Sequence, residues 1–233
     1  MEIDDERIGQ AVKRTEILRL PKQTLSTFGT TNIHYYLLTE PAYSGLFNDT
    51  GETVIREGRV IAERPRIVTP YYLTQLDGFS DSARRYFELL RASRGGQAPG
   101  ILYSYKNEPR ELSIVSDRLA AVVNRLNAEI DGHGDPLVSI IKGEDELWDV
   151  SLLKFISEMT RNSLPSNLEQ LGGRGLLDMD SQGVPLDARV RIDDLFRQVF
   201  RRERDPGELK KELDRWGLFE EYQDRFLALF RRK

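Results

Sequence analysis

Two lysines that are each followed by carboxylates are the side chains of this sequence best suited to chemistry on an anionic molecule. Lys106 precedes Glu108, and Lys142 precedes Glu144 and Asp149, in both cases where an apolar strand is predicted to end. If the two strands run parallel, the lysines would lie at one sheet edge, where α/β folds bind ligands. These residues are candidates for an enzyme site that takes a phosphorylated or otherwise anionic small molecule, with or without Mg²⁺. The alternative role is structural, because the helix dipole favours acidic residues at a helix N-terminus.

Among the segments of this sequence, 178–183 most resembles a known metal-binding motif. Asp178, Asp180 and a glycine at the sixth position are spaced like the oxygen ligands and turn of a calcium loop. The twelfth position, however, is Arg189, where such a loop needs a bidentate glutamate. A phosphatase-like role for the two aspartates also fails, because few residues remain to build the rest of that active site. We therefore predict a solvated acidic turn and no metal site, with Asp178 and Asp180 as the candidates if a cation does bind.

The chain contains no cysteine and only two histidines, which removes most of the usual routes to catalysis. A thiolate nucleophile, a Cys-ligated metal and a disulfide are all excluded. His34 lies in an apolar strand and His133 between two glycines, so we predict a packed side chain and a turn residue respectively. The sequence shows no phosphate-binding loop and no dinucleotide fingerprint. We expect no cofactor, and the sequence favours a binding protein over an enzyme.

The C-terminal segment 187–233 combines arginines with aromatic residues at helical spacing. So short a segment cannot form a stable core alone, so its apolar faces must pack against the preceding domain, a second copy or another protein. Large aromatic residues and arginines are common anchors of protein interfaces. The residues expected to carry an interaction are Phe196, Phe200, Arg201, Arg202, Arg204, Trp216, Phe219, Phe226 and Phe230.

The leading hypothesis is therefore a protein-interaction or regulatory module that binds a partner protein or a second subunit, a homodimer included, through its C-terminal helices. A first alternative is the enzyme that uses Lys106 and Lys142. A second is an RNA- or DNA-binding protein that uses the C-terminal arginines, among them Arg231 and Arg232, since basic clusters bind phosphates. The net charge of −4 gives the whole chain no general attraction for nucleic acid or for an anionic membrane.

Apolar periodicity predicts an α+β (or α/β) fold in which helices flank a mixed sheet of about five to seven strands. A β-hairpin is expected over 53–61, with its turn at 56–58. A strand–helix–strand unit over 111–141 should be parallel and right-handed. The further expected strands are 31–39, 66–69, 101–105, 111–115 and 137–141, and the expected helices are 80–91, 116–131 (capped by Ser116) and 144–162.

The expected organisation has four parts: a polar lead-in over 1–14, a core domain over 15–163, a connector rich in Gly, Pro and Asp over 164–186, and a small helical module over 187–233. No apolar run approaches the ~18 residues that span a bilayer. The first residues are acidic and do not resemble a signal peptide, so we expect a cytoplasmic protein.

Overall fold

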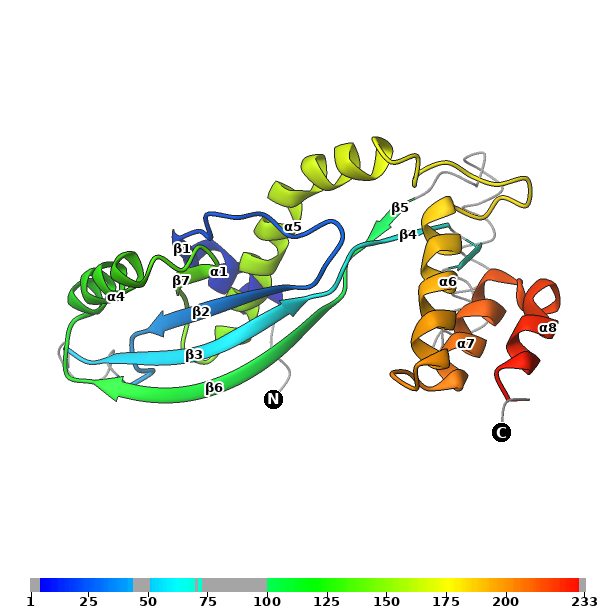
Figure 1. The fold of residues 1–233 in the computed structure, drawn as a ribbon. Helices are drawn as coiled ribbons and strands as arrows, with labels where there is room; N and C mark the ends of the chain where they lie inside the picture. The colour runs from blue at the N-terminus through cyan, green and yellow to red at the C-terminus, as the bar shows by residue number, and fades with distance from the viewer. Residues whose placement is uncertain (1–4, 44–50, 70, 73–99, 231–233) are drawn as a thin grey trace. The chain divides into compact units, whose positions relative to one another are not determined.

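The computed structural model describes residues 5–43, 51–69, 71–72 and 100–230 (Figure 1). The chain is divided into two compact units. The first, which we call the sheet unit, combines Met1–Arg64 with Tyr103–Leu168. The second, the helical unit, combines Pro65–Leu102 with Glu169–Lys233. The helix predicted over 80–91 lies outside the described residues, as do the terminal cations after Phe230.

The sheet unit is built on a mixed five-stranded sheet, which confirms the predicted α+β class. Its strand order is β1 (Glu16–Arg19), β7 (Val138–Lys142), β2 (Thr31–Thr39), β3 (Thr53–Ala62) and β6 (Tyr105–Val115). The β2–β7 pair is parallel and the other pairs are antiparallel. The strands β6 and β7 therefore run in the same direction, as predicted, although β2 and β3 lie between them.

Alternation along β2 sends its side chains into two cores on opposite faces of the sheet. One core joins Ile33, Tyr35 and Leu37 to α5 (Trp148–Gly172), through Leu152, Phe155 and Met159. The other joins Leu38 to α4 (Leu119–His133), through Val122, Leu126 and Ile130. The two helices thus cover opposite faces, which explains why β2 is apolar on both sides.

The predicted hairpin over 53–61 is wrong, because these residues form the single strand β3. Gly58 is the reason for the error, since a glycine between two apolar runs is typical of a turn. Here it faces the ring of Tyr35 on β2, and a Cβ atom at this position would lie 2.5 Å from Cζ of Tyr35. The hydroxyl of Tyr35 donates to Asn107 on β6, 3.0 Å away. Gly58 therefore makes room for a tyrosine that ties three strands together.

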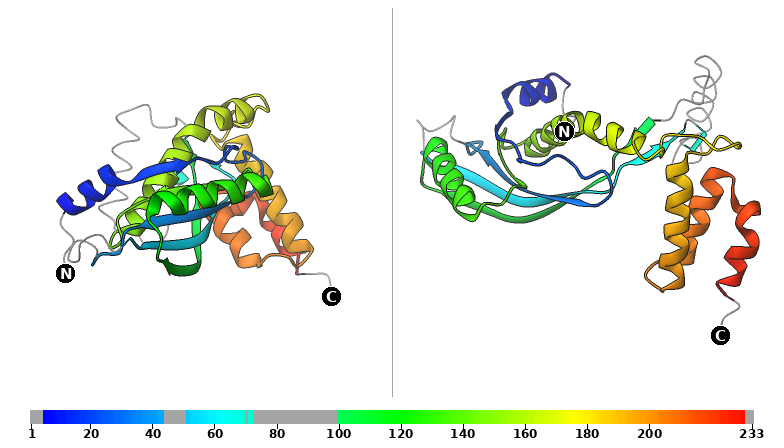
Figure 2. Two further views of the ribbon diagram at one scale, coloured as in Figure 1. Left: turned by 90° about the vertical axis from the view of Figure 1, so that its left-hand side faces the viewer. Right: turned by 45° about the horizontal axis from the view of Figure 1, so that its top comes forward.

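The predicted turn around 107–110 is also wrong. The strand β6 runs through these residues without reversal, with an irregular register opposite Glu57 and Gly58. The short β5 (Gly100–Leu102) instead pairs with β4 (Arg66–Val68) in a separate two-stranded sheet of the helical unit. Pro109 lies on β6, which is an edge strand of the large sheet (Figures 1 and 2), and edge strands are where a sheet tolerates proline.

Both long helices of the sheet unit differ from their predicted bounds. The N-cap of α4 is Arg118, whose side chain makes no capping hydrogen bond, so the predicted cap at Ser116 is wrong. The helix α5 runs past its expected end, through Pro165 and into the stretch 164–186 where we expected a connector. Asn167 explains the continuation, because its buried amide donates 2.9 Å and 2.7 Å hydrogen bonds to the loop before β2.

The first helix, α1 (Asp5–Arg14), occupies the segment from which we expected only a polar lead-in. Its C-terminal end is fixed to α5. Lys154 on α5 donates to the carbonyls of Val12 and Thr15, and the hydroxyl of Thr15 bonds to that of Ser151 at 2.7 Å. Long-range polar contacts of this kind leave no signal in the local sequence.

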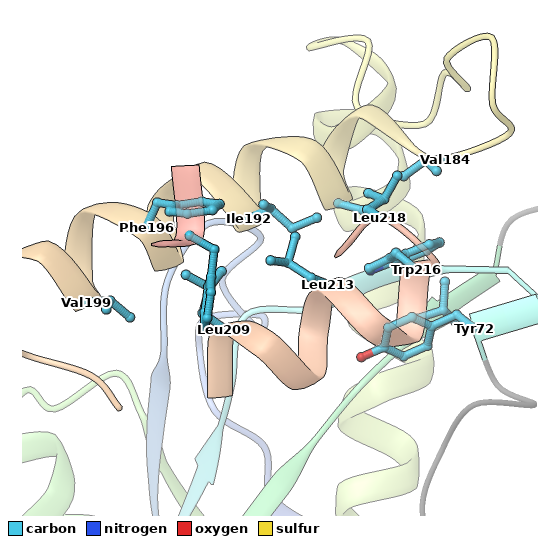
Figure 3. Packing of buried hydrophobic residues seen from close by; sticks show 12 residues of the cluster. Tyr72, Val184, Ile192, Phe196, Val199, Leu209, Leu213, Trp216 and Leu218 are labelled. Atoms are coloured by element: carbon cyan, nitrogen blue, oxygen red, sulfur yellow. The ribbon is translucent and has the colours of Figure 1, made fainter. Parts of the chain in front are cut away.

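The helical unit contains α6 (Leu186–Phe200), α7 (Pro206–Trp216) and α8 (Phe219–Ala228), as the sequence predicted for its C-terminal part. Figure 3 shows the core between them, where Ile192 and Phe196 of α6 face Leu209 and Leu213 of α7. The side chain of Trp216 packs on Tyr72, with ring centroids 4.7 Å apart. Most of the apolar surface of these helices is therefore covered by the chain itself.

A buried carboxylate completes this core. Glu212 on α7 accepts hydrogen bonds from the hydroxyl of Tyr72 at 3.0 Å and from the indole N–H of Trp216 at 3.2 Å. Burial, followed by the nearby charge of Glu212, raises the pKa of Tyr72 above its ordinary value, so Tyr72 remains a donor at neutral pH. Within the described residues, no helix has both the length and the apolar character needed to cross a bilayer.

The first prediction concerns Gly58. Replacement by alanine should lower the free energy of unfolding by about 1–3 kcal/mol, because the new methyl group overlaps the ring of Tyr35. The matched control is Gly132→Ala in α4, where the methyl group meets open space and should raise stability by about 1 kcal/mol. Urea unfolding followed by circular dichroism measures both changes. Equal effects of the two substitutions would contradict the close approach.

The second prediction concerns Glu212. With Trp148 replaced by phenylalanine, Trp216 is the sole tryptophan and its fluorescence reports the unfolding of the helical unit. Glu212→Leu should lower the free energy of unfolding by about 2–3 kcal/mol, because two buried donors lose their acceptor. Glu212→Gln keeps an acceptor oxygen and should cost about 1 kcal/mol. A glutamine variant as unstable as the leucine variant would show that the hydrogen bonds do not stabilise this core.

Candidate partner-binding groove

The structure does not bring the two candidate catalytic lysines together. Because β6 continues through the predicted turn, Lys106 lies at the beginning of that strand, whereas Lys142 ends β7. Across the sheet, Lys142 is level with Leu38, Ile55 and then Ser113. From strand spacing and rise, the two lysines lie roughly 25 Å apart. That separation is too large for one small ligand, so the site proposed for both lysines does not form.

Each of these candidate residues is instead engaged in a local contact. Lys106 pairs with Glu108 at 2.8 Å, and Lys142 pairs with a glutamate of β1 at the same distance. Hydrogen bonds from Lys106 and then Arg59 lower the pKa of Glu108 to about 2. Glu144 pairs with an arginine of α1 at 3.1 Å, and Asp149 accepts from the next backbone N–H of α5. These contacts account for the charges without a substrate.

The loop that contains Asp178 and Asp180 is closed by its own hydrogen bonds. The carboxylate of Asp180 accepts from the backbone N–H groups of Gln182 and Val184 at 2.8 Å and 2.9 Å. The guanidinium of Arg189 donates to its second oxygen at 2.7 Å, so an arginine stands where a cation would be held. Across the described part of the chain, no three His, Asp or Glu side chains are grouped to hold a metal ion.

The two histidines fall in different places of the sheet unit. His34 lies on β2, opposite Arg59 of β3, and is half-buried. His133 ends α4 and is exposed, followed by Gly134 in the left-handed conformation that terminates the helix. Among the described residues, neither histidine belongs to a group of three or more His, Asp or Glu side chains that could hold a metal ion.

The nine residues expected to carry an interaction divide into two sets. Three of them, Phe196, Trp216 and Phe226, are buried in the core of the helical unit, and Phe219 packs against it. The other aromatic residues, Phe200 and Phe230, are 61% and 57% exposed. The three arginines Arg201, Arg202 and Arg204 are exposed as well. Helical spacing alone could not separate these sets, because it is the same for both.

The exposed set lines a single groove of about 1280 Å³ in the helical unit. Its walls come from the C-terminal end of α6, the connection 201–205 and the C-terminal end of α8, which lie at one end of the helices (Figure 1). The apolar lining consists of Phe196, Val199, Phe200, Ala228, Leu229 and Phe230. The basic lining consists of Arg197, Arg201, Arg202, Arg204 and Arg225. We call this feature the groove.

Three of the five arginines in the groove are already neutralised. Arg197 pairs with Asp194 on α6, Arg204 with Glu208 on α7, and Arg225 with Asp193. In the described part of the chain, Arg201 and Arg202 have no carboxylate within ion-pair distance. The groove therefore offers two guanidinium groups without an ion-pair partner in the described chain, next to exposed aromatic rings, and Glu203 and Asp205 line it as well.

The backbone at Arg202 is in a conformation that side chains rarely adopt. Its φ of 61° lies in the left-handed region, and within the described chain it is the sole residue other than glycine with a positive φ. The N–H of Arg202 donates to the carbonyl of Val199, and the N–H of Glu203 donates to that of Gln198. This hydrogen-bond pattern ends many helices and usually places glycine at the left-handed position. Arginine here costs about 1–2 kcal/mol of backbone strain.

Two groove residues, Arg197 and Arg225, were not singled out by the sequence analysis. The guanidinium carbon of Arg225 lies 4.0 Å from the ring centroid of Phe196, so the arginine covers a core aromatic residue at the floor of the groove. A signal was present for Arg197, because it lies between Phe196 and Phe200 on α6. None existed for Arg225, because its contact depends on how α8 packs against α6.

Comparison with known proteins supplies no further constraint, since no protein-family model, curated protein or solved structure matches this chain.

The third prediction tests the strained backbone. Arg202→Gly should leave the free energy of unfolding unchanged or raise it by up to about 1 kcal/mol, because glycine adopts a positive φ without strain. The matched control is the neighbouring Arg201→Gly. Arg201 has a φ of −81°, so glycine there should lower the free energy by about 0.5–1 kcal/mol. Thermal and urea unfolding compare the two variants, and a loss of stability in Arg202→Gly would refute the strain.

Proposed function

We propose that this chain is a protein-binding module whose helical unit holds a segment of a partner protein in the groove. The observation that carries the proposal is the exposure of Phe200 and Phe230 in one concave, arginine-lined surface. Other aromatic residues of the helical unit lie in its core, whereas Phe200 and Phe230 lie on the surface beside it and are 61% and 57% exposed. Exposed aromatic residues framed by arginines are typical of protein interfaces.

The groove is poorly equipped for catalysis. The acidic residues among its described lining are Glu203 and Asp205, and Asp205 is occupied as the N-cap of α7, where its carboxylate accepts from Gly207 at 2.5 Å. No histidine lines it within the described residues. A nucleophile with an adjacent base, or a pair of free carboxylates, is therefore lacking there. This supports binding over catalysis in the groove. A cytoplasmic location is part of the proposal.

RNA or DNA binding is the second candidate, supported by the arginines of the groove and by the exposed aromatic rings on which bases could stack. The local charge balance favours it less. A nucleic-acid strand presents a row of phosphates and is bound by several uncompensated cations. Three of the groove's arginines already share their charge with carboxylates of α6 and α7.

The fourth prediction tests binding of a protein segment. A displayed library of random 16-residue peptides is selected on the full chain and then compared on the double variant Phe200→Ser/Phe230→Ser. We expect peptides whose affinity falls at least about tenfold in the double variant, since both anchors of the groove are removed. Both residues are exposed, so the variant should keep the wild-type unfolding temperature.

The control for this selection is Leu153→Ser. Leu153 is 63% exposed on α5 of the sheet unit, so its replacement removes a comparable apolar surface away from the groove. Peptide affinity should be unchanged by it. Failure to recover any peptide that depends on Phe200 and Phe230 would reject the groove as a protein-binding site.

A further inference from the structure

We infer that the groove binds an acidic amphipathic helix, with apolar side chains placed on Phe200 and Phe230 and carboxylates placed next to Arg201 and Arg202. This inference depends on the proposed function, because it names the chemistry of the partner segment that the groove would hold. Three features of the described residues support it: the walls of the groove, its charges and the strained arginine.

The walls of the groove favour a helix over an extended segment. They are formed by the C-terminal turns of α6 and α8, the connection 201–205 and the residues just after α8, and no strand of the described chain contributes to them. An extended peptide binds best along a strand edge, where its own N–H and C=O groups find backbone partners. The groove offers no such edge among its described residues. A bound segment must therefore satisfy its own backbone, and an amphipathic helix does this while presenting one apolar face.

The charges of the groove favour carboxylates on that helix. Arg201 and Arg202 stand together after the last turn of α6, close to the exposed ring of Phe200. The guanidinium groups of these two consecutive residues have no ion-pair partner in the described chain, so each can donate hydrogen bonds to a carboxylate of a bound helix. Phe230 extends the apolar surface on the α8 side. Its ring packs edge-on against the ring of Phe226, with the ring centroids 5.4 Å apart. The groove therefore has an apolar part and a basic part, complementary to an acidic amphipathic face.

The strained backbone indicates that the guanidinium of Arg202 has a use that glycine could not serve. Left-handed residues other than glycine are costly and cluster at functional positions. The helix end itself would be satisfied by glycine, because its two capping hydrogen bonds use backbone N–H groups alone. A side chain kept at this position against the strain is best explained by what it binds.

The test uses a fluorescein-labelled synthetic 16-residue peptide that carries leucine on one helical face and glutamate along both sides of it. A matched peptide has every glutamate replaced by glutamine. Fluorescence anisotropy with the full-length chain should show at least about tenfold tighter binding of the glutamate peptide, and this advantage should shrink as NaCl rises from about 50 to 500 mM. Equal affinities for the two peptides would overturn the inference.

Three variants locate the binding. Arg202→Gly should lower the affinity for the glutamate peptide at least about tenfold, while the unfolding temperature of the protein stays the same or rises. This combination separates loss of a contact from loss of the fold. Phe200→Ser/Phe230→Ser should lower the affinity for both peptides. The control is Lys211→Gln on α7, an exposed cation outside the groove, which should leave the affinity of both peptides within about twofold. If the Lys211 variant lost as much affinity for the glutamate peptide as the Arg202 variant, the effect would come from the overall charge of the protein, and the inference would be refuted.

The outcomes separate this inference from the proposed function. A groove-dependent preference for glutamine peptides, or for library peptides without acidic residues, would refute the acidic helix and leave protein binding intact. Tighter binding of a labelled 16-nucleotide oligo(U) than of the glutamate peptide would assign the groove to nucleic acid and refute both. Light scattering that shows a dimer of the wild type and a monomer of Phe200→Ser/Phe230→Ser would identify a second copy as the occupant and overturn the separate acidic partner.

Discussion

The packing of α6 against α7 is the interaction on which the rest of the helical unit depends. Ile192 and Phe196 meet Leu209 and Leu213 in a continuous core, and Tyr72 from a distant part of the chain completes it beside Trp216. Once these residues are buried, the last turn of α6 extends beyond the core. Phe200 is one helical turn after Phe196, beyond this core, and it is 61% exposed. The groove is a consequence of where this core ends.

The sheet unit has a different organisation, in which polar and steric contacts between distant segments decide the details. The ring of Tyr35 lies over Gly58, and the amide of Asn167 bonds to the loop before β2. With such contacts, β3 forms one continuous strand and α5 continues beyond Pro165. Local rules that associate glycine with turns and proline with helix ends fail at these positions, because the burial of a neighbour outweighs the local preference.

The sequence predicted what depends on local patterns and missed what depends on packing. The strand β2 matched its expected bounds of 31–39, since its apolar and branched residues leave few alternatives. The helical character of the C-terminal part also followed from periodicity, and in the structure Asp205 and Gly217 cap the two ends of α7. The candidate site was only partly predictable. Phe200 and Arg202 were among the aromatic and basic residues expected to carry an interaction. The exposure of Phe200 and the backbone strain at Arg202, however, depend on the three-dimensional packing. Lys106 and Lys142 failed as a pair because the direction of β6 was misjudged at its first residues.

The groove at one end of the helical unit is the surface proposed to bind a partner. Chemical-shift mapping tests it most directly, with the ¹⁵N-labelled full chain titrated with the glutamate peptide described above. The account predicts that perturbed amide signals concentrate in residues 196–206 and 225–230, around Phe200, Arg202 and Phe230. Perturbations spread over the sheet unit, or centred on its edge strand β6, would contradict it.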